Sequence, residues 1–264
     1  MFMPELPDVE AVARRLRGAL AGRRISRVDV VDRTVVRSPG PRTFARRLRG
    51  RTIREIARRG KYLLVYLSGG AVLVGHLRMT GDFLTTSRRE PRRPHTRLVL
   101  GMNGIDLRFI DQRRFGHVDL VDERGVATFA GLRALGVEPL TAAFSVEYLR
   151  RLIARRRGML KAFLLRQDLI AGIGNIYADE ILFQARLHPA RRLETLRPAQ
   201  VTVLHRTIRR VLRRAIAALS RGGTAVGRLV AVRDRGGSCP RCGRPLHIAT
   251  IAGRTTYFCP HCQR

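Results

Sequence analysis

The sequence of 264 residues contains no tryptophan and only four cysteines. It has 20 acidic residues against 52 basic ones, and only Lys61 and Lys161 among those 52 are lysines. It also lacks any run of 18 apolar residues, and its start is acidic rather than basic and apolar. These absences argue against a membrane-spanning helix and a secretory leader, so we expect a cytoplasmic protein with no membrane partner.

The excess of basic residues gives a formal net charge of +32. Such a charge favours a polyanionic partner, because each phosphate that a protein neutralises releases bound counterions. The composition therefore predicts binding to nucleic acid. A ribosomal or chromosomal architectural protein would have the same charge, so composition alone leaves that alternative open.

The apolar pattern changes along the chain. Apolar residues fall on one helical face after Asp8, and the helix is expected to close near Gly22. Short β-branched or aliphatic segments follow without intervening helices, which is typical of an antiparallel sandwich. The segments expected to be strands are 25–31, 62–67, 71–77, 96–100, 105–110 and 117–121. The Asn103-Gly104 pair predicts a type I′ hairpin between two of them.

Helical patterns begin near residue 131. Ser145 is expected to cap a helix that continues to about Arg156, and a second helix covers about 158–166. A glycine-rich turn precedes a helix near Asn175, and Pro198 starts a long helix. We therefore predict an α+β multidomain protein: an N-terminal helix plus antiparallel β-sandwich (1–131), a helical domain (132–224) and a C-terminal zinc-finger hairpin (225–264).

All four cysteines lie at the C-terminal end, as Cys239-x2-Cys242 and Cys259-x2-Cys262 with sixteen residues between the pairs. Two such pairs are typical of a closed tetrahedral zinc site, whereas disulfides are the weaker alternative inside a cell. Four thiolates leave no open coordination position. The sequence therefore predicts one structural Zn²⁺ and no metal catalysis, with His247 and His261 outside the ligand set.

Several further motifs resemble the formamidopyrimidine-DNA glycosylase and endonuclease VIII family, and they occur in the family's order over nearly the whole chain. They are MPELPDVE (3–10), RGKYLL (59–64), HLRMTG (76–81), DQRRFG (111–116), GIGNIYADE (172–180) and the four cysteines. The resemblance implies a helix–two-turn–helix in the helical domain. It also implies a base-excision-repair enzyme that removes damaged bases from double-stranded DNA and cleaves the resulting abasic site.

The resemblance implies that Pro4 is the nucleophile. A free N-terminal proline is a secondary amine that can attack the sugar C1′, and the resulting iminium keeps a positive charge that permits β- and δ-elimination. Glu5 would then handle protons. Lys61 would lie at the damaged nucleotide. Glu180 would support the N-terminal end that carries Pro4. Without the family, Glu5 could equally cap the helix that starts near Asp8, and Lys61 could be a solvated charge.

The remaining family matches imply grips on DNA from which the damaged base has been flipped. Met79 and Phe115 would fill the gap and Arg113 would face the orphaned base, although both apolar residues could equally be core. Asn175 opens a helix whose free amides could bind a phosphate. Lys161 would be a phosphate-side lysine, and Arg254 would clamp phosphates from the zinc hairpin. The other DNA contacts implied are His95, Arg114 and Tyr177.

The sequence departs from the family in several places. Met1 and Phe2 precede the expected initiator Met3, so a blocked Pro4 would leave a catalytically inactive protein that binds damaged DNA. The segment between Thr224 and Cys239 is short, which puts a preference for 8-oxoguanine in doubt. Val232 stands where a tyrosine is usual, and Gln112 where a proline is common. We otherwise expect a nucleoid-associated protein that acts as a monomer.

Overall fold

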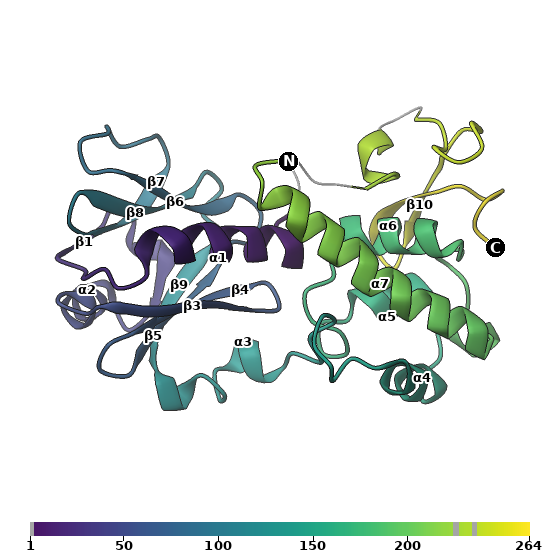
Figure 1. The fold of residues 1–264 in the computed structure, drawn as a ribbon, viewed down its shortest axis with the longest axis horizontal. Coiled ribbons are helices and arrows are strands. Elements are labelled where there is room, and N and C mark those ends of the chain that lie inside the picture. Colours follow the sequence, from purple (N-terminus) through teal and green to yellow (C-terminus); the bar gives the residue numbers. More distant parts are fainter. Residues whose placement is uncertain (1–2, 224–226, 234–236) are drawn as a thin grey trace. The chain divides into compact units, whose positions relative to one another are not determined.

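A computed structural model describes residues 3–223, 227–233 and 237–264 (Figure 1). Met1, Phe2, Thr224 and parts of the segment before the cysteines lie outside the described residues, so the short-loop prediction falls largely outside them. The chain divides into two compact units. The first contains the residues up to Pro4 and Asp8–Arg133, and the second contains Glu5–Pro7 and Ala134–Arg264.

The first helix, α1 (Leu6–Leu20), forms as its apolar spacing predicts. The side chains at 9, 12, 13, 16 and 20 are all buried, and they pack into the core of the first unit. Leu6 instead belongs to the core of the second unit, where its backbone N–H donates to the Gly172 carbonyl at 3.0 Å. The start of α1 is therefore fixed by the second unit and its body by the first.

Two sheets form the rest of the first unit, as predicted. One has the order β1-β7-β8-β6 and the other β2-β9-β5-β4-β3, and the named strands pair antiparallel except β2 with β9. The strands are β1 (Arg27–Val30), β2 (Val36–Ser38), β3 (Ile53–Arg59), β4 (Tyr62–Leu67), β5 (Ala71–His76), β6 (Gly81–Ser87), β7 (Thr96–Gly101), β8 (Ile105–Asp111) and β9 (His117–Asp122). The short helices are η1 (Arg33–Val35), α2 (Pro41–Leu48), η2 (Glu123–Gly125) and α3 (Ala130–Arg133).

The hairpin between β7 and β8 forms, but its predicted turn type is wrong. A type I′ turn needs a positive φ at both central residues. Gly104 has a φ of 74°, whereas Asn103 is not among the residues with positive φ. The prediction identified the hairpin and misassigned the backbone of its first turn residue.

The second unit is helical and ends in a short hairpin. Its elements are α4 (Val146–Ala154), α5 (Leu160–Leu165), α6 (Asn175–Ala185), η3 (Leu193–Thr195), α7 (Pro198–Leu219), η4 (Val230–Val232), β10 (His247–Ile251) and β11 (Arg254–Phe258). The Ser145 side chain accepts from the Tyr148 N–H at 3.0 Å and caps α4, as predicted. Pro198 is the first residue of α7, where its missing N–H is tolerated.

Candidate active site and metal centre

The four cysteines meet at the base of the β10–β11 hairpin. Their Sγ atoms all lie within 4.8 Å of one another, with 3.9 Å between Cys239 and Cys262 and 3.6 Å between Cys242 and Cys259. Zn–S bonds of about 2.3 Å in a tetrahedron place sulfurs about 3.8 Å apart. The thiolates therefore fit one structural Zn²⁺. His261 instead contacts Arg244, at 3.1 Å.

The tip of this hairpin has a two-residue turn. Ala252 and Gly253 both have positive φ, at 54° and 67°, as a type I′ turn requires. Ile251 pairs directly with Arg254 across the turn, and Arg254 is exposed. The geometry thus presents the Arg254 guanidinium at the end of a tight, metal-anchored hairpin.

Glu5 is buried, at 1% exposure, and its carboxylate closes the N-terminus of α6. It accepts from the backbone N–H groups of Gly174 at 2.7 Å, Ile176 at 2.8 Å and Tyr177 at 3.2 Å. A Cβ at position 174 would lie 2.4 Å from the Glu5 Cδ, so only glycine permits this approach. The alternative that Glu5 caps α1 is wrong, because it caps a helix about 170 residues later in the chain.

The Glu5 carboxylate and the Asn175 side chain both lie at the N-terminal end of α6. The N–H groups of the N-cap Gly174 and of Ile176 and Tyr177 donate to Glu5, so an anion already lies at this helix end. The Asn175 side chain turns to the zinc hairpin, where its Nδ2 donates to the Thr255 carbonyl at 2.9 Å. The backbone N–H of Asn175 is not among the donors to Glu5, so a phosphate contact at this helix end stays a prediction.

Lys61 lies in the turn between β3 and β4, beside Gly60, whose φ is 57°. It is only 8% exposed, so the alternative of a solvated strand-end charge is wrong. Burial lowers the pKa of the neighbouring His76 to about 3, with the Arg78, His117 and Lys61 charges adding to the effect. His76 is thus neutral, and its Nδ1 accepts from the Arg78 N–H at 3.0 Å.

Asp111 joins the turns that hold the predicted DNA contacts of the first unit. Its buried carboxylate accepts from the backbone N–H of Arg113 at 3.2 Å, from that of Gly116 at 2.7 Å and from the Thr80 hydroxyl. The Arg113 N–H also donates to the Thr80 Oγ1 at 3.0 Å. This network brings together the turn carrying Met79 and the segment carrying Arg113 and Phe115.

Most of the predicted DNA-contacting side chains on these turns are exposed. Phe115 is 49% exposed, so core packing is the wrong interpretation for it, whereas Met79 is half-buried. The Arg113 guanidinium lies over the Phe115 ring, 4.7 Å from its centroid. Arg114 and His95 are exposed with left-handed backbones, at φ values of 57° and 65°.

Two residues expected to touch DNA are instead enclosed in the second unit. Lys161 is fully buried, and its Nζ lies 2.6 Å from Asp179 Oδ1 and 2.7 Å from Thr256 Oγ1. Tyr177 is 1% exposed in the core cluster of this unit. Direct phosphate contact by Lys161 and direct contact by Tyr177 are therefore corrected to internal packing.

Glu180, one turn along α6 from Ile176, is fully buried. Its oxygens accept from the backbone N–H groups of Arg228 at 3.0 Å, Leu229 at 2.8 Å and Val230 at 3.1 Å. Its described contacts thus anchor the segment that follows α7, ahead of the cysteines. Support of the proline end by Glu180 stays a prediction.

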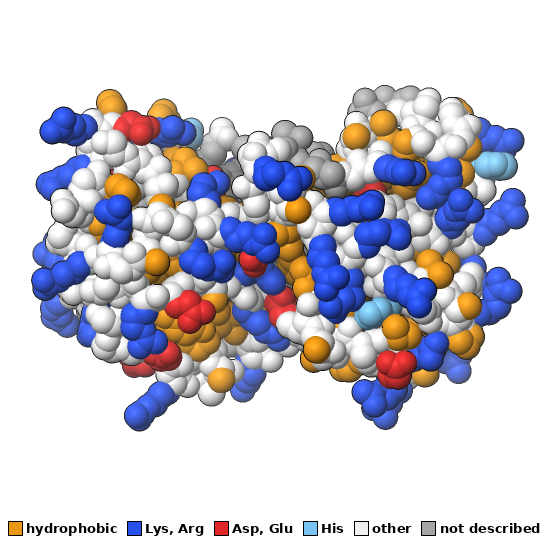
Figure 2. Space-filling view, in the orientation of Figure 1, with side chains coloured by type: hydrophobic (Ala, Val, Ile, Leu, Met, Phe, Trp, Pro, Cys, Tyr) orange, Lys and Arg blue, Asp and Glu red, His pale blue; other side chains and the backbone are white. Residues whose placement is uncertain are grey.

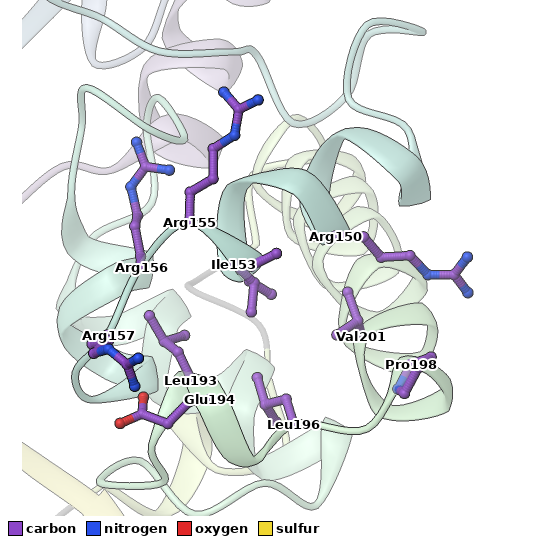
Figure 3. Close-up of a pocket in the computed structure, with 11 residues that line it drawn as sticks. Arg150, Ile153, Arg155, Arg156, Arg157, Leu193, Glu194, Leu196, Pro198 and Val201 are labelled. Atoms are coloured by element: carbon purple, nitrogen blue, oxygen red, sulfur yellow. The ribbon is translucent and has the colours of Figure 1, made fainter.

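One hollow of the second unit lies away from these residues. It has a volume of about 630 Å³ in the second unit, where apolar side chains of α4, η3 and α7 are rimmed by arginines (Figure 3). None of the predicted site residues lines it. Glu5 and Lys161 instead contact α6, and Asn175, Tyr177 and Glu180 belong to it.

Basic side chains cover both units on the face shown in Figure 2, where acidic ones are few. None of the described helices is long and apolar enough to cross a membrane. Together with the four-cysteine hairpin and the sandwich, this surface defines a zinc-finger protein suited to holding a polyanion.

Comparison with known proteins identifies the family. Family models match the formamidopyrimidine-DNA glycosylase N-terminal domain at residues 3–118, its H2TH domain at 135–226, and a zinc finger found in FPG and IleRS at 236–264. A formamidopyrimidine-DNA glycosylase of Symbiobacterium thermophilum is 45% identical over 99% of this chain and 89% of its own. One of Moorella thermoacetica is also 45% identical, over 92% and 93%.

Comparison with solved structures leads to the same family. The Lactococcus lactis formamidopyrimidine-DNA glycosylase bound non-covalently to DNA with an abasic site superposes with a TM-score of 0.90, at 32% identity over 98% of this chain and 99% of that one. The same enzyme with DNA containing an oxidised pyrimidine gives the same score and identity over 99% and 100%. The chain belongs to the formamidopyrimidine-DNA glycosylase family.

Proposed function

We propose that this chain excises damaged bases from double-stranded DNA and cleaves the abasic site that results, using Pro4 as the nucleophile. The observation that carries the assignment to this chain's own residues is the fixed position of Glu5. Its carboxylate is held by three backbone N–H groups of α6, and Pro4 is the residue directly before it. A buried anion thus follows immediately after the proposed nucleophile.

The proline nitrogen has to be free, because within a peptide bond its lone pair is delocalised. Its attack on the sugar C1′ breaks the glycosidic bond, and the electron pair leaves with the base, which takes up a proton. Opening of the sugar ring then gives an iminium between C1′ and the nitrogen. Loss of the C2′ proton expels the 3′ phosphate, loss of the C4′ proton expels the 5′ phosphate, and water finally releases the amine.

Glu5 and Lys61 complete the proposed catalytic set. The Glu5 carboxylate would stabilise the iminium cation and exchange protons with the sugar oxygen and the amine. Its three N–H donors stabilise its negative charge and fix its orientation. Lys61, buried beside a neutral His76, would place its ammonium at the damaged nucleotide.

The exposed residues of the two units would grip the DNA. Met79 and Phe115 would occupy the space left by the flipped base, and Arg113 would face the orphaned partner. His95, Arg114 and Arg254 would contact phosphates, which position the strand without reading its sequence. The zinc-bound hairpin would supply a rigid mount for Arg254. Action on chromosomal DNA would place the protein at the nucleoid, and one chain carries every proposed catalytic group, so we propose a monomer.

We propose three domains for these roles: 1–131 with the nucleophile and the sandwich, 132–224 with the helix–two-turn–helix, and 225–264 with the zinc finger. Structures of the Lactococcus enzyme contain N7-benzyl-Fapy-dG, an oxidised pyrimidine or an abasic site. Abasic-site cleavage is the step common to all base lesions, because every excised base leaves such a site. It is therefore the activity to test first.

Replacement of the nucleophile separates the enzyme from a protein that only binds damage. For Pro4→Gly, we expect cleavage of an abasic duplex to fall by at least about 100-fold, the usual scale for losing a catalytic group. Affinity for the same duplex should stay within about twofold, since phosphate contacts dominate binding. Undiminished cleavage would show that the proline ring is not required, because the variant keeps a free α-amine that can also form an imine. Binding without any cleavage by the unaltered protein with a free Pro4 would leave a damage-binding protein.

A further inference from the structure

We propose that Lys161 is a positioning residue, which together with Asp179 fixes the Arg254 hairpin to α6 so that Arg254 can clamp a DNA phosphate. This inference rests on the proposed function for the clamp itself. It assigns to Lys161 an indirect role, in place of the phosphate contact that its family match implies.

The first step is the burial of the lysine. Lys161 is 0% exposed, and its ammonium has three partners at donor distance. These are Asp179 Oδ1 at 2.6 Å, Thr256 Oγ1 at 2.7 Å and the Thr255 carbonyl at 3.4 Å. The ammonium thus has one ion-pair partner and two hydrogen-bond acceptors inside the protein, and its full burial keeps it away from a phosphate.

The second step is the position of these partners in the hairpin. Thr255 and Thr256 are the two residues directly after Arg254 in β11. The Thr256 hydroxyl, which accepts from Lys161, also donates to the Arg254 carbonyl at 2.9 Å. Lys161 therefore acts on the backbone of the strand that carries Arg254.

The third step concerns Asp179, the ion-pair partner of Lys161, which also contacts the hairpin. Its Oδ2 accepts from the Tyr257 N–H at 3.2 Å and lies 3.1 Å from the Arg233 guanidinium. That guanidinium in turn lies over the Tyr257 ring, 4.9 Å from its centroid. Asp179 is fully buried, so its charge depends on Lys161 and Arg233 for compensation.

The fourth step is that α6 holds both the hairpin and the Glu5 carboxylate. Glu5 binds the first turn of α6, and Asp179 lies one turn further along the same helix. Asn175 adds a bond from its Nδ2 to the Thr255 carbonyl at 2.9 Å. A rigid helix thus sets the distance between the Glu5 carboxylate and the strand that carries Arg254, and Lys161 is the buried link that maintains it.

A double-mutant cycle tests this assignment. The variants are Lys161→Met, Arg254→Ala and the two together, and the probe is a duplex carrying one tetrahydrofuran abasic analogue, titrated at several salt concentrations. We expect each single change to weaken binding by about tenfold to a hundredfold, the value of a charge-assisted hydrogen bond. The double variant should bind no more weakly than Arg254→Ala alone, because Lys161 acts only through that residue.

A direct phosphate contact predicts a different result. The two losses would then multiply, and the slope of log K against log salt would decrease by a further ~0.9 in the double variant. Either that outcome or unchanged binding by Lys161→Met would overturn the positioning role. Arg124→Met, which removes an exposed cation of η2, is the matched charge control, and its effect should stay below about twofold.

Lys161→Met could also prevent folding, since it leaves Asp179 with one cationic partner fewer. Zinc content and the thermal midpoint identify that case. Thr256→Val then replaces it in the cycle, because it removes the hydroxyl between Lys161 and the Arg254 carbonyl and leaves the ion pair intact. The same non-additivity with Arg254→Ala is expected, with a smaller single effect, and additive effects would overturn the proposal. All of these experiments measure affinity for the duplex. A failure of Pro4 to act as the nucleophile would appear separately, in assays of cleavage.

Discussion

The turn cluster around Asp111 and the N-terminal turns of α6 use buried carboxylates in opposite ways. Asp111 receives N–H groups from turns whose side chains, such as Arg113 and Phe115, point to solvent. Glu5 and Asp179 connect parts of the second unit that are themselves buried. The difference shows that one family motif can contain two kinds of residue. Some would contact the substrate, and others hold the contacting residues in place. Exposure distinguishes the two.

Removal of zinc should have the largest effect on stability. The loss of structure should be confined to the second unit. Cys259→Ser removes a fully buried ligand. Structural zinc contributes about 10–16 kcal/mol of binding free energy, so the β10–β11 hairpin should unfold without it. Hydrogen exchange of amides 247–258 should become unprotected, while protection in β4 and β5 stays unchanged. Loss of protection in both units would contradict this separation.

Loss of the Glu5 cap should have the next largest effect on the free energy of unfolding. Glu5→Ala leaves three buried N–H groups of α6 without their acceptor, which should lower the free energy of unfolding by about 3 kcal/mol. Glu147→Gln is the matched control, because Glu147 is an exposed acid in the first turn of α4. Its loss should cost about 0.5 kcal/mol. Urea denaturation measures both, and equal costs would show that Glu5 is an ordinary surface charge.

A smaller, pH-dependent effect is expected in the first unit. Burial lowers the pKa of His117 to about 4 from the usual value near 6.5, so the folded state binds fewer protons than the unfolded one between these pH values. Its stabilising contribution is complete above pH 6.5 and is lost as the pH falls towards 4. His117→Phe should remove this dependence, so that the variant loses about 2 kcal/mol less than the wild type over this range. Parallel stability curves would contradict the assignment.

The smallest effect on stability is expected at Phe115. Because this ring is 49% exposed, Phe115→Ala should change the free energy of unfolding by less than about 0.5 kcal/mol. Affinity for an abasic duplex should nevertheless fall, by about tenfold, since aromatic stacking is lost. Phe109→Ala is the control, because Phe109 is fully buried and its loss should cost about 3–5 kcal/mol. A large stability loss for Phe115→Ala would place its ring in the core.

The sequence predicts elements whose apolar spacing is regular. The stripe of α1, the strand β4 and the long α7 all follow from periodicity or from flanking turn residues. The strands β2, β3 and β6 and the helix α2 were missed. In β3, Ile53 and Ile56 are three residues apart and surrounded by charges, and a bulge shifts its pairing with β4. An alternating pattern is then absent, because the irregular register decides which side chains face the core.

The candidate site shows a similar limit. Motif matches identify Glu5, Lys161 and Glu180, but the contacts that tie them to distant segments, 18 to 172 residues away, follow only from the folded chain. Asp111 and Asp179 lie within the family motifs, but the sequence assigns no role to them or to Arg233. The only available signal was that both carboxylates stand inside or beside otherwise apolar or glycine-rich segments. Burial separates Lys161 and Tyr177 from the exposed arginines, and sequence alone does not supply it.

The central claim is that the Pro4 nitrogen forms the covalent intermediate. Borohydride reduction in the presence of a duplex with one abasic site traps such an iminium. The measurement uses two forms of the protein, one beginning at Pro4 and one in which Met3 still precedes it, with the attachment site located by peptide mass. The account predicts an adduct at residue 4 in the first form and none in the second. An adduct at another residue, or no adduct from a form that binds the duplex tightly, would contradict it.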